Sequence, residues 1–259
     1  MAEQREIHQR AKEQFGATAG NYVTSRSHAR GKDLEALVDA AGNVETKRVL
    51  DIATGGGHTA IALAKLGAVV TASDITPEII GAAKGNAENH GVALEYVECA
   101  AESLPFAAGQ FEIVSCRIAP HHFADPAAFV SEVARVLVSK GRFLMIDNIS
   151  PENDRLADIA NTVERRRDPS HVTTYSVSQW ACYLAHAGLE LNLFRRWTKR
   201  KIFHEWASVS HMSAADRDEL GRFVLSLDAE AADYLQVETK QGDLVAISHE
   251  AALFVADKP

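Results

Sequence analysis

The sequence has little of what would mark a disulfide-rich, zinc-binding or membrane-spanning protein. Its three cysteines, Cys99, Cys116 and Cys182, lie far apart and form no CxxC pair, which argues against a disulfide framework and a zinc knuckle. No apolar run reaches the ~18 residues that a membrane span needs. The segment Met1 to Glu6 has no apolar stretch behind its charges, so we expect no secretory signal and a cytoplasmic location.

Basic residues are outnumbered by acidic ones. Lys and Arg total 27 and Asp and Glu total 35, which gives a formal net charge of −8. A field of this sign repels polyanions, so nucleic acid is not an expected partner. Two basic runs, Arg165–Arg167 and Arg195–Lys201, depart from this pattern. Such runs usually form a solvated helix face or strand edge, and the alternative is an anionic substrate or an acidic partner.

Short apolar runs that alternate with Ala- and Leu-rich helical segments predict an α/β domain. Strands are expected near 48–53, 68–73, 93–98, 111–116, 141–147, 189–197 and 243–256. The predicted fold is a Rossmann-like three-layer sandwich, in which a seven-stranded, mostly parallel sheet carries helices on both faces, with a helical insert. Ligands of such sheets bind beyond the carboxyl ends of the strands.

We expect a single domain built from four consecutive segments. These are an N-terminal helical cap (1–45), a cofactor-binding core (46–149), a lid insert (150–177) and a C-terminal completion of the sheet (178–259). The insert is predicted where the strand alternation stops, and we expect it to cover the ligand crevice. It should line the acceptor pocket together with residues 195–211.

The strongest motif is a glycine turn between a strand and a helix, from Val49 to His58. Glycines allow the backbone to approach a ligand closely, and the free N–H groups of such a turn face it. Gly55, Gly57 and Ala60 also fit the G-x-G-x-x-A form of a dinucleotide loop. The carboxylate of Asp51, just before the turn, would repel a pyrophosphate and attract a cationic amino group, which favours the methionine part of S-adenosylmethionine.

Three further segments follow the ends of predicted strands. Asp74 can accept hydrogen bonds from both ribose hydroxyls, of NAD and of S-adenosylmethionine alike. The loop Ala101–Phe106 can wall one face of an adenine ring. The segment Arg117–Pro126 leaves the fourth strand, where a substrate should meet the reactive methyl group.

Taken together, these residues resemble the Rossmann-like S-adenosylmethionine-dependent methyltransferases of the type 11 group. Within that group the sequence is most similar to the branch with the ubiquinone and menaquinone C-methyltransferases. The resemblance covers residues 10–150, and Glu164–His171 with Tyr175 extends it to 190 through a subgroup of uncharacterised relatives.

The resemblance implies a role for each matching residue. The methionine end would be held by Asp51, Ala53, Gly55, Gly56 and Gly57, the ribose and one adenine face by Asp74 and Ile75, and the adenine edge by Ala101 and Glu102, with Arg117 near the carboxylate or the methyl group.

Two positions depart from the family pattern. Ala53 replaces the first usual glycine of the loop and is expected to have a negative φ. Ala100 stands where relatives often carry an Asp or Asn that bonds the adenine amino group. Adenine binding would then rest more on backbone N–H groups and packing.

The acceptor site is less well defined by the sequence. Methyl transfer is an in-line displacement at carbon, so most of the enzyme's work is positioning. Candidate bases are His28, His121, His122, His171 and Tyr175, of which we favour His122 and His171 as catalytic. We expect His121, Arg167 and Tyr175 to bind substrate.

No metal is expected at this site, and the N-terminal residues are candidates for a cover over it. A metal held by His121, His122 and Asp125 is disfavoured, because adjacent side chains of an extended segment point in opposite directions. The N-terminal residues Phe15, Tyr22, Ser27 and His28 either fold over the cofactor and exclude water or belong to a helix that only packs on the core. Planar acceptors could pack on Trp180, Trp197 and Trp206.

The sequence therefore predicts methyl transfer from S-adenosylmethionine to a small-molecule acceptor. Methylation at carbon or oxygen of an aromatic, quinol-like compound is the leading interpretation, and it rests on the resemblance alone. The alternatives are a non-catalytic S-adenosylmethionine-binding protein and an NAD-dependent Rossmann dehydrogenase. The missing Tyr-x-x-x-Lys pair after the fifth strand argues against the dehydrogenase. A homodimer is left open.

Overall fold

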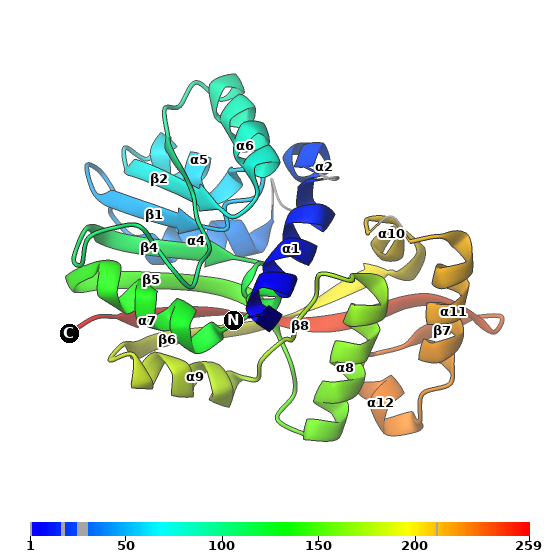
Figure 1. Ribbon diagram of the computed structural model, residues 1–259. Coiled ribbons are helices and arrows are strands. Elements are labelled where there is room, and N and C mark those ends of the chain that lie inside the picture. The colour runs from blue at the N-terminus through cyan, green and yellow to red at the C-terminus, as the bar shows by residue number, and fades with distance from the viewer. Residues whose placement is uncertain (1, 17–18, 25–30, 211) are drawn as a thin grey trace.

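A twisted, mostly parallel sheet forms the centre of the molecule (Figure 1). The computed structural model describes residues 2–16, 19–24, 31–210 and 212–259. The strands follow the order β3-β2-β1-β4-β5-β8-β6, and β7 pairs with β8 as an eighth strand. Their bounds are β1 Arg48–Ile52, β2 Val69–Asp74, β3 Glu95–Glu98, β4 Phe111–Arg117, β5 Leu137–Ile149, β6 Glu190–Ile202, β7 Glu238–Lys240 and β8 Asp243–Asp257.

The direction of the strands agrees with the sequence prediction. Strands β1 to β5 pair in parallel, whereas β8 runs antiparallel to both β5 and β6. The α/β, Rossmann-like fold class is therefore confirmed. Strands β5 and β6 are longer than expected, and together with β8, which agrees with its predicted range to one residue, they extend the sheet beyond the parallel core.

Helices cover both faces of the parallel core. Val49 of β1 packs in one hydrophobic cluster with α4 (Lys32–Ala41) and α5 (His58–Lys65), whereas Leu50 and Ile52 pack in another with α7 (Pro126–Val136) and α9 (Val177–His186). Successive side chains of a strand alternate between the two faces, so a strand that is covered on both must be apolar throughout. The continuous apolar runs of the sequence follow from this burial.

Helix α7 begins with a local signal that the sequence carries. The side chain of Asp125 accepts a hydrogen bond of 2.9 Å from the backbone N–H of Ala128, and Pro126 occupies the first turn. Helix α6 (Pro77–Asn89) likewise begins with a proline, as predicted. Asp125 therefore serves as an N-cap for α7.

The projecting ends of β6 and β8 carry a second cluster of helices, which we call the lobe. It consists of α8 (Asp154–Arg167), α10 (Phe203–Ser208), α11 (Ala214–Leu225) and α12 (Ala229–Tyr234), which share one hydrophobic cluster with Ile247 of β8. Figure 1 shows β8 running from the lobe to the C-terminus. Residues of the predicted insert at 150–177 therefore pack together with residues 203–237. From the sequence, residues 203–237 were assigned to the C-terminal completion of the sheet.

Helix α1 (Ala2–Gly16) crosses the carboxyl edge of the sheet and is followed by α2 (Ala19–Thr24). Its His8 lies 3.2 Å from Glu102, and its Lys12 lies 3.1 Å from Glu98. The side chain of Tyr22 and residues 27 and 28, for which the sequence predicted a covering role, lie outside what the structure describes. Within the described ranges, no helix is both long and apolar enough to cross a membrane.

Candidate functional site

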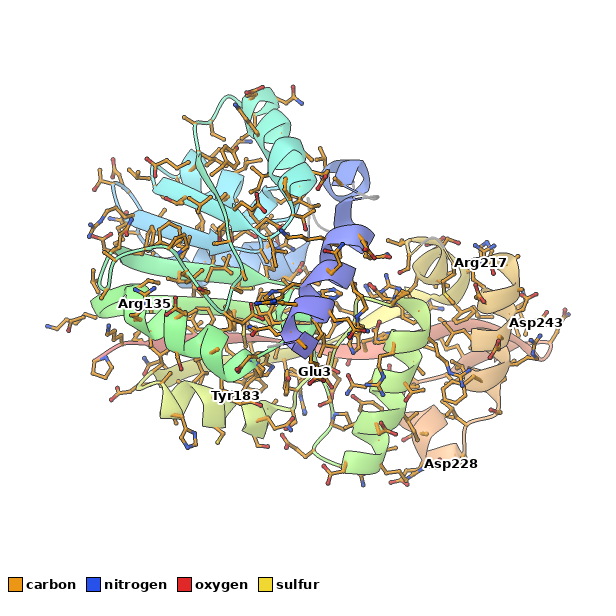
Figure 2. The ribbon with its side chains drawn as sticks, in the orientation of Figure 1. Glu3, Arg135, Tyr183, Arg217, Asp228 and Asp243 are labelled. Carbon is orange, nitrogen blue, oxygen red and sulfur yellow. The ribbon has the colours of Figure 1, made fainter. Side chains whose placement is uncertain are left out.

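A cavity of about 290 Å³ lies at the carboxyl ends of the parallel strands. It is lined by the ends of β1, β2, β4 and β5 together with α1 and the lobe. Figure 2 shows side chains crowded between α1 and these strand ends, whereas Asp228 and Asp243 mark the outer parts of the lobe. The cavity stands where ligands of open α/β sheets bind.

The glycine turn after β1 forms one wall of this cavity. The buried Asp51 carboxylate accepts 2.7 Å hydrogen bonds from the hydroxyls of Thr54 and Ser115. Burial raises the pKa of Asp51, although these hydrogen bonds oppose the rise. Two hydroxyl donors leave lone pairs on the carboxylate for a ligand.

The expectation of a negative φ at Ala53 is wrong. Its φ is +51°, in the same left-handed region as Gly55 (+55°) and Gly57 (+78°). The chain must turn back within a few residues to start α5, which requires this conformation at all three positions. A Cβ atom makes the left-handed region costly, so Ala53 is a strained residue at the wall of the cavity.

Asp74 closes β2 beside this turn. Its carboxylate accepts hydrogen bonds from the N–H groups of Gly55 (3.2 Å) and Thr76 (3.0 Å). Burial raises the pKa of Asp74 to about 6, against the effect of these hydrogen bonds. Asp74 therefore fixes the turn and presents a carboxylate to the cavity, which it lines.

The residues that the resemblance assigned to the adenine lie in one part of the cavity wall. Ile75, Ala101 and Glu102 line the cavity as the resemblance implied, and Cys99 lines it in addition. Glu102 also holds the entrance together, because it accepts a 2.8 Å hydrogen bond from the N–H of Ala124 and contacts His8 of α1. Gly56 lines the cavity, whereas Gly57 lies behind it as the N-cap of α5.

A buried ion network links the part of the cavity beside the glycine turn to the part beside the lobe, which we call the lobe end. Arg117 donates to Asp33 at 3.1 Å and to the Thr59 hydroxyl at 3.0 Å, and Lys199 of β6 lies 3.4 Å from Asp33. Burial alone would raise the pKa of Asp33, but the charges of Lys199 and Arg117 bring it below the usual value. The sequence analysis missed Asp33 and did not single out Lys199, because nothing local marks either residue.

Two histidines of the short 3₁₀ turn Pro120–His122 line the cavity. His121 contacts the buried Asp147 at 2.6 Å, and the charge and hydrogen bond of Asp147 outweigh burial and raise the pKa of His121. Burial and the neighbouring His121 lower the pKa of His122 to about 4. His122 is therefore neutral near pH 7, and because Nδ1 lies 3.0 Å from the Ser170 carbonyl oxygen, Nε2 is its acceptor atom.

The expectation that these two rings point in opposite directions is wrong. Their centroids are 4.1 Å apart, because the segment is a 3₁₀ turn and not extended. The ring of Phe15 from α1 meets His122 edge-on at 4.9 Å. This contact places Phe15 over the site, in line with its expected covering role.

His171 and Tyr175 do not reach the cavity that the described residues form. His171 is buried, its Nε2 lies 2.8 Å from Oδ1 of Asn161, and burial lowers its pKa to about 3. Tyr175 packs on Trp180 and Tyr183 with ring centroids 5.3 and 5.6 Å away. The structure thus does not support a base at His171 or a substrate contact at Tyr175.

The lobe end of the cavity carries groups that the sequence analysis largely missed. Arg167 lines it as predicted, with its guanidinium 5.0 Å from the ring centroid of Trp206. It is joined there by Glu164 and His249, which lie 2.8 Å apart. Trp206 lines the cavity, whereas Trp180 and Trp197 pack in the hydrophobic clusters of the core.

The comparisons with known proteins agree with this geometry. A family model described as a methyltransferase domain matches residues 50–145. The uncharacterised methyltransferase YcgJ of Bacillus subtilis is 33% identical over 227 residues, which is 83% of this chain and 90% of YcgJ. The chain belongs to the Rossmann-like methyltransferases.

Two further relatives match different shares of this chain. The solved BH2331 protein of Bacillus halodurans C-125 superposes with a TM-score of 0.86 at 38% identity, over 88% of this chain and all (100%) of that one. The ubiquinone biosynthesis O-methyltransferase of Xanthomonas axonopodis pv. citri is 31% identical over 179 residues, 65% of this chain and 75% of its own.

The family model matches residues at one end of the cavity of this methyltransferase and not those at the other end. Residues 50–145 include the glycine turn, Asp74 and Arg117, and we call this end of the cavity the cofactor end after the role expected from the sequence. Glu164, Lys199 and His249 of the lobe end lie outside the matched segment. The family model therefore describes the cofactor end, and we infer the acceptor from the residues of the lobe end.

Proposed function

We propose that this methyltransferase uses S-adenosylmethionine and methylates a small molecule bound at the lobe end of the cavity. The observation that carries the proposal is Asp51, a buried carboxylate that lines the cavity beside a left-handed glycine turn. A cationic amino group is the natural partner of such a carboxylate, and a pyrophosphate would be repelled by it.

The residues of the cofactor end fit the parts of this cofactor. Asp51 with Gly55 and Gly56 would hold the methionine end, and Asp74 would accept hydrogen bonds from the ribose hydroxyls. Ile75 and Glu102 would border the adenine. When bound, the cofactor supplies an electrophilic methyl group on a sulfonium that is already a good leaving group.

The remaining work of the protein is orientation and exclusion of water. Phe15 and His8 of α1 line the cavity, so we assign α1 the role of a cover. His122 is neutral with Nε2 as its acceptor atom, which suits it to accept a hydrogen bond from the bound methyl acceptor. His121 with Asp147 supports it from the same turn.

The acceptor atom is proposed to be oxygen or carbon of an aromatic, quinol-like compound. Support comes from the similarity to the ubiquinone biosynthesis O-methyltransferase, which extends over 65% of the chain. The lobe end refines this class, as argued below.

Calorimetric titration of the full chain with S-adenosylmethionine, S-adenosylhomocysteine and NAD tests the cofactor directly. We expect the first two to bind with dissociation constants on the order of micromolar, about −8 kcal/mol, and NAD not to bind. Binding of NAD alone, or of none of the three, would overturn the proposal.

A further inference from the structure

The lobe end of the cavity contains two polar groups that have no partner among the described residues. One is Nε2 of His249, which is buried and makes no hydrogen bond. The other is the ammonium of Lys201, for which the described part of the chain supplies neither a hydrogen bond nor an ion pair. Both residues line the cavity. Buried polar groups are usually paired, so the orphaned Nε2 of His249, with the half-buried ammonium of Lys201 in the same cavity, points to a ligand that pairs with both.

The sheet places these two groups on one face. His249 of β8 is the register partner of Lys199 on β6, and Lys201 follows two residues later opposite Ile247. Register partners share a face of the sheet, and so do alternate residues of a strand. The diagonal neighbours His249 and Lys201 therefore have Cα atoms ~7–8 Å apart, a span that a small molecule can bridge.

His249 is held in a fixed orientation. Its Nδ1 lies 2.8 Å from Oε1 of Glu164, and its ring centroid lies 5.2 Å from that of Trp206. A carboxylate accepts hydrogen bonds, so Nδ1 carries a proton toward Glu164, and Nε2 is the ring atom left for a ligand. The side chain is only 10% exposed. A hydroxyl group fits this orphaned ring nitrogen, because a hydroxyl can both donate and accept a hydrogen bond.

The charges around Lys201 leave one cation in excess. Arg117 and Lys199 share Asp33, and Arg167 lies 3.5 Å from Glu164 and 3.9 Å from Asp168.

Lys201 stands beside these paired cations without an anion of its own. His121, also at this end, is balanced by Asp147. A single excess positive charge matches a monoanion such as a carboxylate better than a doubly charged phosphate.

We propose that the lobe end binds a hydroxylated organic carboxylate, with the carboxylate on Lys201 and the hydroxyl on Nε2 of His249. This inference rests on the proposed function, because it names the class of acceptor for the methyl group. It narrows the proposed class of methyl acceptors from quinol-like compounds to hydroxylated carboxylic acids. The residues of the cofactor end carry no information on this point.

Binding of matched probes to the full chain, with and without S-adenosylhomocysteine, tests the inference. The probes are 4-hydroxybenzoate and 3-hydroxybutanoate, each with its analogue that lacks the hydroxyl and its analogue with an amide in place of the carboxylate. We expect the hydroxy acids to bind about tenfold or more tightly than either analogue, because each analogue leaves one protein group unpaired.

Two variants assign the preference to the two residues. Lys201→Gln should abolish the preference for carboxylate over amide and keep the preference for the hydroxyl. His249→Asn retains a group that can reach Glu164 but lacks Nε2, so it should do the reverse. Lys240→Gln, at an exposed position on β7, is the matched control and should change neither preference.

Several outcomes would overturn the inference. These are failure of both hydroxy acids to bind, equal binding of acids and analogues, or retention of both preferences in Lys201→Gln and His249→Asn. Thermal unfolding of each variant identifies loss of the fold, and if Lys201→Gln does not fold, Lys201→Met takes its place. Failure of S-adenosylhomocysteine to bind would count against the proposed function, while the probes still judge the acid site in the same preparation.

Discussion

Replacing Asp51 with Asn removes the charge that we assign to the recognition of the cofactor amino group and keeps the shape of the side chain. Asp51 is 2% exposed and already accepts hydrogen bonds from Thr54 and Ser115. A hydrogen bond between charged groups contributes about 1.5–3 kcal/mol, and a neutral amide recovers only part of it. We therefore expect S-adenosylmethionine and S-adenosylhomocysteine to bind about 10- to 100-fold more weakly.

The fold should tolerate this substitution. One hydroxyl can keep donating to the new amide oxygen and the other can rotate and accept from the amide NH2, and burial already raises the pKa of Asp51, so its charge is not stabilised by the fold. The free energy of unfolding should change by less than about 1 kcal/mol. Titration calorimetry and urea denaturation measure the two quantities, with Asp39→Asn, at an exposed position of α4, as control. An affinity within twofold of the wild type would refute our account of Asp51.

Three further predictions follow from the geometry of the site. Ala53→Gly should raise the free energy of unfolding by about 0.5–1 kcal/mol, because φ is +51° at this position; a less stable variant in urea denaturation would contradict the strain. Asp33→Asn should lower the free energy of unfolding by about 3 kcal/mol, because Arg117 and Lys199 lose their shared anion. An unchanged midpoint of urea denaturation would show that the network is not stabilising. S-adenosylhomocysteine should bind more weakly as the pH falls from 7 to 5, because Asp74, with a pKa of about 6, gains a proton and loses acceptor capacity. This weakening should be largely absent in Asp74→Asn, as measured by calorimetry at several pH values. The same pH dependence of affinity in both proteins would show that Asp74 is not responsible.

The residues that we assign to the cofactor could be located from the sequence because they follow local signals. Asp51 and Asp74 each stand at the end of an apolar run, and a strand, a glycine turn and a helix follow one another without interruption. Parallel strands bring their carboxyl ends to one edge of the sheet, so residues at these ends meet without any knowledge of distant contacts. The conformation of Ala53 was the exception, since the tight turn overrides the preference of a residue with a Cβ atom.

The lobe end could not be predicted in the same way. Lys199 and His249 are 50 positions apart in the sequence and become neighbours only through the antiparallel pairing of β6 with β8. Asp33 joins them from α4. His171 and Tyr175 lie next to favourable motifs in the sequence, but the packing of their segment turns them toward Asn161 and Trp180. Nothing periodic marks such residues, because their roles come from long-range packing.

The most direct test of the account is a crystal structure of the chain with S-adenosylhomocysteine. We predict that its amino group contacts Asp51, that its ribose hydroxyls contact Asp74, and that its sulfur faces the end of the cavity with Lys199 and His249. A ligand bound outside the cavity, or inside it with the amino group away from Asp51, would contradict the assignment of the two ends.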